Sequence, residues 1–248
     1  MQWRDQGVVL GGRRFGESGL ILDVLTASRG RRSGLVYGGA SRKKRAQYEP
    51  GNIVEVSWSG RLEDQLGRFD IAEAETLHAA QHLDNPTALL AISSLAEILR
   101  QALDEGDDAG SAVYGPSLIV LDSLSADGVW PALYARWELG LLAALGFGLD
   151  IDQCALSGAT TGLTHVSPNT GRAVRAEEAA EYLDRLFPLP AFLQGAELST
   201  PSRTDILDGL QLTGFFMETR LFAALHRGVP PVRKRLVDRL RKSLSDTS

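Results

Sequence analysis

The sequence predicts an α+β protein with two domains, a small closed β-barrel followed by an all-helical domain. Apolar residues recur at β-strand spacing up to about residue 77 and at helical spacing from residue 78 onward. A length of 248 residues suits two domains. A hydrophobic content of 44% with 23% charged residues is typical of a chain with a real core.

Five short runs in the first domain, residues 1–77, have strand character. They cover residues 3–12, 18–26, 33–37, 52–59 and 62–74, and turn residues separate them. The fourth run alternates clearly, with Ile53, Val54, Val56 and Trp58 against polar neighbours. A five-stranded Greek-key barrel of the OB type accounts for this pattern, because closure removes most exposed strand edges.

A basic stretch over residues 38–50 separates the third and fourth runs. Arg42, Lys43, Lys44 and Arg45 are consecutive, and Gly38-Gly39 and Pro50-Gly51 enclose them. We expect a long exposed loop here. A charge run is usually only a solvated face. This run, however, lies between two barrel strands, in a segment (residues 13–45) with nine Lys/Arg against Glu17 and Asp23, which favours a polyanionic partner.

The second domain, residues 78–248, is expected to be helical. Helices are predicted from Pro86 with Asn85 as cap, over residues 117–124, 131–145, 177–186 and 203–225, and over a basic terminal helix, 231–244. The terminal helix is more readily a docked amphipathic end than a DNA contact. Residues 150–175 form a knob with a predicted hairpin at 163–166 and 171–174, and its role is left open.

The sequence contains no catalytic constellation. No P-loop, dinucleotide-binding glycine motif or nucleophile elbow occurs, so we expect no enzyme, no catalytic residue and no cofactor. His78 and His82 lie four residues apart but have no third metal ligand nearby, and a solvated face is the simpler interpretation. No apolar stretch could cross a membrane, the N-terminus does not resemble a signal peptide, and the single Cys154 fits a reducing cytoplasm.

Several motifs in fixed order resemble the RecO family of recombination mediators. They are Gly7-Val-Val-Leu10, Arg14-Phe-Gly-Glu-Ser18, Leu25-Thr26, Arg29-Gly-Arg31, the basic loop before Glu49-Pro-Gly-Asn52, Leu145-Gly-Phe-Gly-Leu-Asp150, Cys154-Ala-Leu-Ser-Gly158 and Val166-Ser-Pro-Asn-Thr-Gly-Arg-Ala-Val174. The resemblance spans nearly the whole chain, and the order of the motifs is more specific than any one of them.

The resemblance implies a non-enzymatic role in recombinational DNA repair. It implies an OB domain that binds single- and double-stranded DNA and a helical domain that holds the C-terminal tail of single-stranded-DNA-binding protein. With RecR, such a protein replaces that binding protein by the RecA recombinase, and it anneals complementary strands. A cytoplasmic, nucleoid-associated location follows. Arg136, Arg220 and the terminal helix are candidate contacts for the acidic tail.

Many family members hold zinc in the knob with two Cys-x-x-Cys pairs. Here Cys154 is the first cysteine of such a pair, Ser157 replaces its mate, and the second pair is missing. One thiolate cannot hold a structural zinc, so we expect no metal in this knob.

Single-strand binding on OB domains combines a basic groove with aromatic stacking. The candidate nucleic-acid-binding residues are Arg13, Arg14, Arg31, Arg32, Arg42, Lys43, Lys44, Arg45, Phe15 and Tyr48. Tyr37 and Trp58 are further stacking candidates, with core packing favoured for Trp58. Neutralising residues 42–45 is expected to weaken DNA binding and flatten its salt dependence.

Other functions remain open at this point. One is an adaptor whose OB and helical domains bind only proteins, which predicts no DNA binding by the isolated chain at low salt. Another is an RNA-directed OB module, which predicts a preference for RNA over DNA of equal sequence. A hydrolase is a distant fourth.

Overall fold

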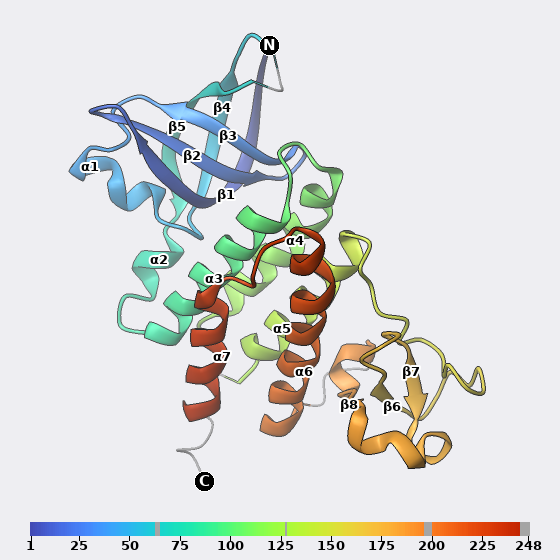
Figure 1. Cartoon of the computed structure of the whole chain (residues 1–248). Helices are drawn as coiled ribbons and strands as arrows, with labels where there is room; N and C mark the ends of the chain where they lie inside the picture. Colours follow the sequence, from blue (N-terminus) through green and yellow to red (C-terminus); the bar gives the residue numbers. More distant parts are fainter. Residues whose placement is uncertain (63–64, 127, 196–199, 244–248) are drawn as a thin grey trace. The chain divides into compact units, whose positions relative to one another are not determined.

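The computed structural model describes residues 1–62, 65–126, 128–195 and 200–243 (Figure 1). The chain divides into two compact units. The first comprises Met1–Ser125 with Pro230–Leu236, and the second comprises Ala126–Val229 with Val237–Ser248. The predicted boundary after residue 77 marks the change from strands to helices, whereas by packing the helices between residues 78 and 123 belong to the unit of the barrel.

Five strands close into a barrel in the first unit, which confirms the predicted fold class. They are β1 (Gln2–Phe15), β2 (Gly19–Thr26), β3 (Gly30–Val36), β4 (Ile53–Ser59) and β5 (Gly67–Thr76). Their order is β1-β2-β3-β5-β4, and β4 pairs back with β1. The β3–β5 pairing is parallel and the others are antiparallel, which is the arrangement of an OB barrel.

The barrel core is built from alternate positions of the strands. Val9, Leu22, Val24, Val36 and Val56 are buried there among others. Aromatic rings close one end: Trp3 stacks on Trp58 with 5.6 Å between ring centroids, and Phe69 lies edge-on to Trp3. Trp58 is only 3% exposed, in agreement with its predicted place in the core.

The seam between β3 and β5 is the shortest pairing of the barrel. Two residue pairs make it, Gly34 with Gly67 and Leu35 with Arg68. A Cβ on Gly34 would lie 2.4 Å from the ring of Phe69, and one on Gly67 would lie 2.2 Å from Trp58. Glycine is therefore needed on both sides of the seam, because two aromatic rings lie directly against its backbone.

Arg42, Lys44 and Arg45 are exposed as expected, but part of the basic stretch is helical rather than a loop. Arg42–Arg45 form one helical turn, α1, and Ala46–Tyr48 continue it as a 3₁₀ turn. No Gly or Pro occurs between residues 42 and 49, and Arg, Lys, Ala and Gln all favour helix. The connection thus holds its cations on a short ordered segment.

Three helices complete the described part of the first unit before residue 125: α2 (His78–Gln81), α3 (Pro86–Ala102) and α4 (Asp108–Ser123). The side chain of Asn85 accepts hydrogen bonds from the N–H groups of Thr87 and Ala88, so the predicted cap is confirmed. α3 packs against β1, and α4 packs against β2 and β3. Figure 1 shows both helices beside one end of the barrel.

The predicted start of α4 at residue 117 was wrong. Asp107 caps the helix by accepting from the N–H of Ala109, and the helix passes through Pro116. Gly115 and Pro116 are both exposed. The carbonyl that the proline ring leaves without a helical partner can therefore bond to water, which makes an interior proline tolerable.

The second unit contains two long helices and the knob. α5 (Trp130–Ala144) begins with Pro131 in its first turn as predicted, and it packs against α6 (Arg203–Phe216). α6 starts with a capping box between Ser202 and Asp205 and continues as a π-helical turn, Met217–Phe222, within the predicted helix 203–225.

Short segments differ from the expectation in the rest of this unit. The predicted helix at 177–186 consists of two 3₁₀ segments, Ala176–Glu178 and Ala180–Arg185, and a third follows at Ala191–Gln194. The knob hairpin forms from β6 (Leu163–Val166) and β7 (Ala173–Arg175), and β8 (Phe187–Pro188) adds a strand to give the order β7-β6-β8.

The terminal helix α7 covers Pro231–Ser243. The predicted last residue, Leu244, lies outside the described residues. Among the helices that the structure describes, none combines the length and the apolar character needed to cross a bilayer.

Candidate nucleic-acid interface

A groove of about 580 Å³ lies on the first unit between the end of β1, the α1 segment and α3. Its lining residues come from five connected stretches of that unit: Leu10, Gly11, Gly12, Arg13, Arg14, Leu20, Asp23, Gly39, Ala40, Arg45, Tyr48, Glu49, Pro50, Glu97 and Arg100. The groove therefore draws on strand, turn and helix.

Four arginines from three elements line this groove. Arg13 and Arg14 come from β1, Arg45 comes from α1, and Arg100 comes from α3. Arg13 and Arg14 are exposed, and neither forms an ion pair with a described side chain. The N–H groups of these two arginines are thus available to phosphate oxygens.

The groove also contains three carboxylates: Asp23, Glu49 and Glu97. Arg45 lies 3.8 Å from Glu49, and both side chains are largely exposed, so this contact is weak. Asp23 is already paired with Arg31 and accepts a hydrogen bond from Ser33, both on β3. The groove is therefore less positive than its arginines alone imply, and its unpaired cations gather at the end of β1.

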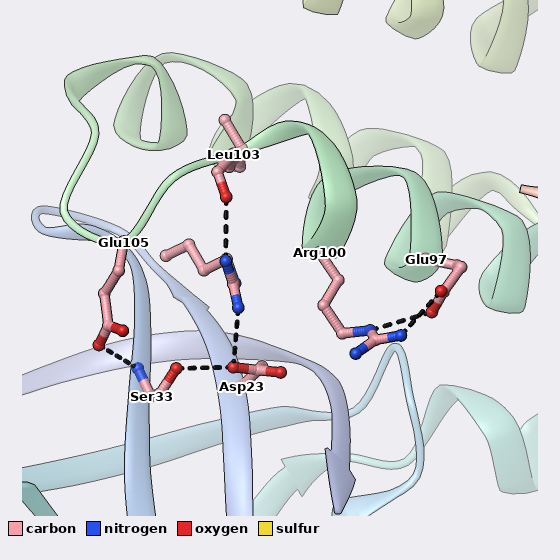
Figure 2. A network of polar contacts seen from close by, with 7 residues as sticks. Asp23, Ser33, Glu97, Arg100, Leu103 and Glu105 are labelled. Carbon is pink, nitrogen blue, oxygen red and sulfur yellow. Dashed lines mark hydrogen bonds and ion pairs between the residues drawn. The ribbon is translucent and has the colours of Figure 1, made fainter. Parts of the chain in front are cut away.

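Arg100 was missed by the sequence analysis. Its Nε and Nη2 donate to the two carboxylate oxygens of Glu97 at 3.0 and 2.8 Å, which holds the guanidinium at the groove (Figure 2). The hydrogen bond to Glu97 raises the pKa of Arg100. Burial acts to raise the pKa of Glu97, but hydrogen bonds from Arg100 and Gln101 outweigh it and keep that pKa below its ordinary value. The sequence pattern that could have indicated this pair is Glu97-x-x-Arg100, because residues three apart near the end of a predicted helix lie side by side.

Arg31 and Arg32 are placed differently from Arg13 and Arg14. Arg31 pairs with Asp23 at 3.2 Å and donates to the carbonyl of Leu103 at 3.0 Å. Ser33 adds two bonds, its hydroxyl to Asp23 and its backbone N–H to Glu105, so β2, β3 and the α3–α4 connection form one network (Figure 2). Arg32 donates to the carbonyl of Arg29. Both arginines are half-buried, and their role in DNA binding stays a prediction.

The remaining predicted cations lie on α1. Arg42 and Lys44 are exposed but do not line the groove, whereas Arg45 does. The side chain of Lys43 lies outside the part of the chain whose side chains the structure describes. Only one of the three described cations of this run thus faces the groove.

The predicted aromatic residues separate into two kinds. Tyr48 is 7% exposed in the barrel core, and burial raises the pKa of its hydroxyl. Phe15 and Tyr37 are 51% and 62% exposed, and the guanidinium of Arg68 lies 5.1 Å from the centroid of the Tyr37 ring. The exposed ring faces needed for base stacking therefore belong to Phe15 and Tyr37 rather than to Tyr48.

Cys154 lies buried in the knob and donates from its Sγ to Glu178 at 2.9 Å. Among the described residues, no group of three or more His, Cys, Asp or Glu side chains converges as a metal site requires. That the knob works without zinc stays a prediction. Arg172 joins Asp150 at 3.1 Å beside a bridge between the same two residues, which ties the knob to its entry segment.

His78 and His82 are buried rather than solvated, contrary to the simpler of our two interpretations. Neither ring nitrogen of His78 has a hydrogen-bond partner among the described groups, and its Nε2 lies 3.4 Å from Asp122 Oδ1. Burial lowers the pKa of His78, Asp122 acts in the opposite direction, and His82 adds to the lowering. The environment of the ring therefore favours its neutral form in the folded chain.

An OB barrel with an arginine-lined groove, joined to a helical region, is an architecture that many nucleic-acid-binding proteins share. Comparison with known families narrows this class. The model "Recombination protein O N terminal" matches residues 1–78, and "Recombination protein O C terminal" matches residues 83–227. The chain belongs to the RecO family, whose role lies in recombinational DNA repair.

Similar proteins extend over the whole chain. The DNA repair protein RecO of Hyphomonas neptunium is 62% identical over 240 residues, which cover 97% of this chain and 98% of that protein. The RecO proteins of a Ruegeria species (strain TM1040) and of Rhodospirillum rubrum are 42% and 40% identical, with at least 97% of each chain covered. The resemblance found in the ordered motifs is thereby confirmed.

Proposed function

We propose that this chain is a non-enzymatic recombination mediator that binds DNA in the groove between β1, α1 and α3. The convergence of Arg13, Arg14, Arg45 and Arg100 carries this proposal. Guanidinium groups bind phosphate oxygens through paired, charge-assisted hydrogen bonds. Contacts to phosphates carry no sequence information, so binding is expected to be largely independent of sequence and to weaken steeply with salt.

The same groove supports strand annealing. Two complementary strands repel one another through their phosphates, and arginines that neutralise one strand lower this repulsion. Membership of the RecO family supports the further roles that we propose: replacing single-stranded-DNA-binding protein by RecA together with RecR. A cytoplasmic, nucleoid-associated location follows from such a role.

We assign the acidic tail of single-stranded-DNA-binding protein to the second unit. Arg220 lies over the ring of Phe216 at 4.6 Å, and its Nη2 is 3.5 Å from the carbonyl oxygen of Asn169. The ring of Phe216 is fully buried, so the partly exposed guanidinium of Arg220 is the group that is available to the terminal carboxylate of such a peptide. Arg136 on α5 is a second, half-buried candidate. Loss of tail-peptide binding in Arg220→Ala, with retention in Arg185→Ala, is the expected result.

The central experiment is fluorescence anisotropy of the purified chain with labelled single-stranded DNA across a salt series. Tight binding at low salt that weakens linearly on a log–log scale is expected, with a slope of about 0.7 for each phosphate contact. Replacing Arg42, Lys43, Lys44 and Arg45 together is expected to flatten this slope. An unchanged slope would remove α1 from the interface. Absence of binding by the wild-type chain at low salt would favour a protein-only adaptor.

A further inference from the structure

The inference concerns Asn52, a buried side chain behind one wall of the groove. This wall is the segment of residues 45–50, from which Arg45, Tyr48, Glu49 and Pro50 line the groove. Asn52 follows the wall closely in sequence and is only 1% exposed. A buried amide side chain needs partners for its donor and for its acceptor, so its hydrogen bonds show what it holds together.

The side-chain amide of Asn52 donates to the carboxyl end of the helical part of the wall. Its Nδ2 lies 2.9 Å from the carbonyl oxygen of Ala46 and 3.3 Å from that of Gln47. The last carbonyls of a helical segment have no helical N–H to accept from, so another donor has to serve them. α1 has four residues and its 3₁₀ continuation has three. A helical segment this short is unstable alone, and its orientation depends on such contacts.

The other polar groups of Asn52 bind the surroundings of the wall. Its Oδ1 accepts from the N–H of Ala79 on α2 at 3.4 Å, and its carbonyl accepts from the N–H of Val9 on β1 at 2.9 Å. Its own N–H donates to the carbonyl of Glu49 at 3.3 Å. These partners fix the orientation of the amide, because a flipped amide would set its oxygen against two carbonyl oxygens. Asn52 therefore connects the wall with both a strand and a helix.

Asn52 lies at the fork where β1 and β4 separate and the groove begins. β1 pairs with β4 over Gln2–Val8, and the hydrogen bond between Val9 and Asn52 comes one residue later. The next residues of β1, Leu10–Gly12, already line the groove. A movement of the wall about this fork would therefore change the distance between Arg45 and the arginines of β1.

We propose that Asn52 is a positioning residue of the groove, which holds the wall so that Arg45 faces the same DNA strand as the arginines of β1. The Arg45 side chain is 80% exposed, and its contact with Glu49 at 3.8 Å is weak. The backbone of the wall therefore decides where this guanidinium lies. Asn52 is buried and acts only through the wall. This inference rests on the proposed function and identifies the residue that brings two of its elements together.

The first test measures the salt dependence of binding to a labelled oligothymidylate by fluorescence anisotropy. Arg45→Ala and Asn52→Ala are each expected to reduce the slope by about 0.7, the value of one phosphate contact on a single strand. The double variant is expected to lose about 0.7 as well, because both changes remove the same contact. Asn52→Ala combined with Arg13→Ala is expected to lose about 1.4, because the contact of Arg13 is independent.

A second readout uses no DNA. Trypsin cleaves after Lys and Arg, and residues 42–45 supply four consecutive sites. Cleavage requires the helical turn to open locally. We expect cleavage after residues 42–45 to be about tenfold faster in Asn52→Ala than in the wild type, which is the effect of two lost hydrogen bonds. The masses of the fragments identify the cleaved bond.

Two further variants separate positioning from general stability. Asn85→Ala removes another asparagine of the same unit that bonds to a helix end, and it is expected to lower the midpoint of urea denaturation. Its salt slope and its cleavage at residues 42–45 are expected to match the wild type. Asn52→Asp keeps the size of the side chain and the acceptor for Ala79 but replaces the donor by an oxygen. It is expected to behave as Asn52→Ala in both assays.

The wild-type chain supplies a measurement that needs no variant. In ¹⁵N NMR spectra, the side-chain amide protons of buried Asn52 are expected to exchange with water much more slowly than those of exposed Asn169. Equal exchange at the two side chains would overturn the anchoring of the wall, even if both variants of Asn52 failed to fold.

The outcomes separate the role of Asn52 from DNA binding itself. An unchanged slope in Asn52→Ala, or a loss that adds to that of Arg45→Ala, would overturn the positioning role while DNA binding in the groove stands. Equally fast cleavage in Asn85→Ala would replace positioning by a general loss of stability. Failure of the wild-type chain to bind at low salt would overturn the proposed function, and the positioning role with it.

Discussion

The two arginine pairs of the barrel, Arg13-Arg14 and Arg31-Arg32, are alike in sequence and differ in what surrounds them. The first pair ends β1 beside the groove and forms no ion pair with a described side chain. In the second, Arg31 meets Asp23 and a helix-end carbonyl. The difference shows that an exposed arginine with no anion beside it is more available to a ligand than one that the fold has already paired with a buried carboxylate.

The largest expected effect comes from breaking the bound pair. Arg31→Ala leaves Asp23, which is 8% exposed, without its cation. Because burying an unpaired carboxylate is costly, we expect the free energy of unfolding to fall by about 2–3 kcal/mol. Urea denaturation measures this change. Arg13→Ala is the matched control and is expected to stay within about 0.5 kcal/mol of the wild type. Equal losses in both variants would contradict the comparison.

The exposed pair is expected to give the converse result. Arg13→Ala/Arg14→Ala removes two cations from the groove, so we expect single-stranded DNA to bind about tenfold more weakly at low salt and the salt slope to fall by about 1.4. Anisotropy across a salt series measures both quantities. The control Arg185→Ala removes an exposed arginine of the second unit and is expected to leave the slope as it is. A weaker affinity with an unchanged slope would argue against phosphate contacts at this pair.

A smaller effect on stability is expected from acid, through His78. The pKa of its buried ring lies below 6.5 in the folded chain, so below about pH 6.5 the unfolded chain binds more protons than the folded chain. The contribution of His78 to the free energy of unfolding is therefore fully present above about pH 6.5. It is lost as the pH falls toward the pKa of the folded chain. Histidine titrates between about pH 5 and pH 7.5. Over this range we expect the free energy of unfolding, measured by urea denaturation, to depend less on pH in His78→Leu than in the wild type.

The control for that pH series is His226→Asn, which changes an exposed histidine of the second unit. Asn is compatible with the positive φ of 52° at this position. The pH dependence of this variant is expected to match that of the wild type. If the pH dependence of unfolding became weaker in His226→Asn and stayed unchanged in His78→Leu, the buried ring of His78 would not be the cause of that pH dependence.

The smallest expected effect comes from a carboxylate inside the groove. Glu97→Gln removes a carboxylate beside Arg100 and keeps a carbonyl that can still accept from its guanidinium. Since one negative charge leaves the surface that faces phosphate, we expect about two- to threefold tighter DNA binding at low salt, with the gain lost at high salt. Tighter binding that persists at high salt would point to a change of shape instead of charge.

Much of the fold could be predicted from local patterns. The alternation over Ile53–Ser59 and the turn residues between strands gave the barrel, and Asn85 and Pro131 marked helix starts that the structure confirms. The differences arise where tertiary contacts outweigh local preference. Pro116 lies inside α4 because its side of the helix is exposed, and Phe187–Pro188 becomes a strand only because β6 is there to pair with it.

The site was predictable in part, and for a definite reason. The density of positive charge along the chain pointed to Arg13, Arg14 and Arg45. It could not show which of the neighbouring arginines would form ion pairs within the fold. Asp23 is eight residues before Arg31 and becomes its partner through the register of β2 and β3. Arg100 lies fifty-five residues after Arg45 and reaches the groove only because α3 packs on β1. The spacing of residues along the chain predicts neither the pairing of Asp23 with Arg31 nor the position of Arg100 at the groove.

The seam between β3 and β5 has a consequence for motion. Every other junction of the barrel is held by a longer ladder, whereas this one depends on two residue pairs with rings laid over glycine. Local opening of a fold follows the path that breaks the fewest hydrogen bonds. The β3–β5 seam is therefore where we expect the barrel to open locally. Backbone amide exchange at Leu35 and Arg68 is expected to be faster than at the β1–β2 ladder.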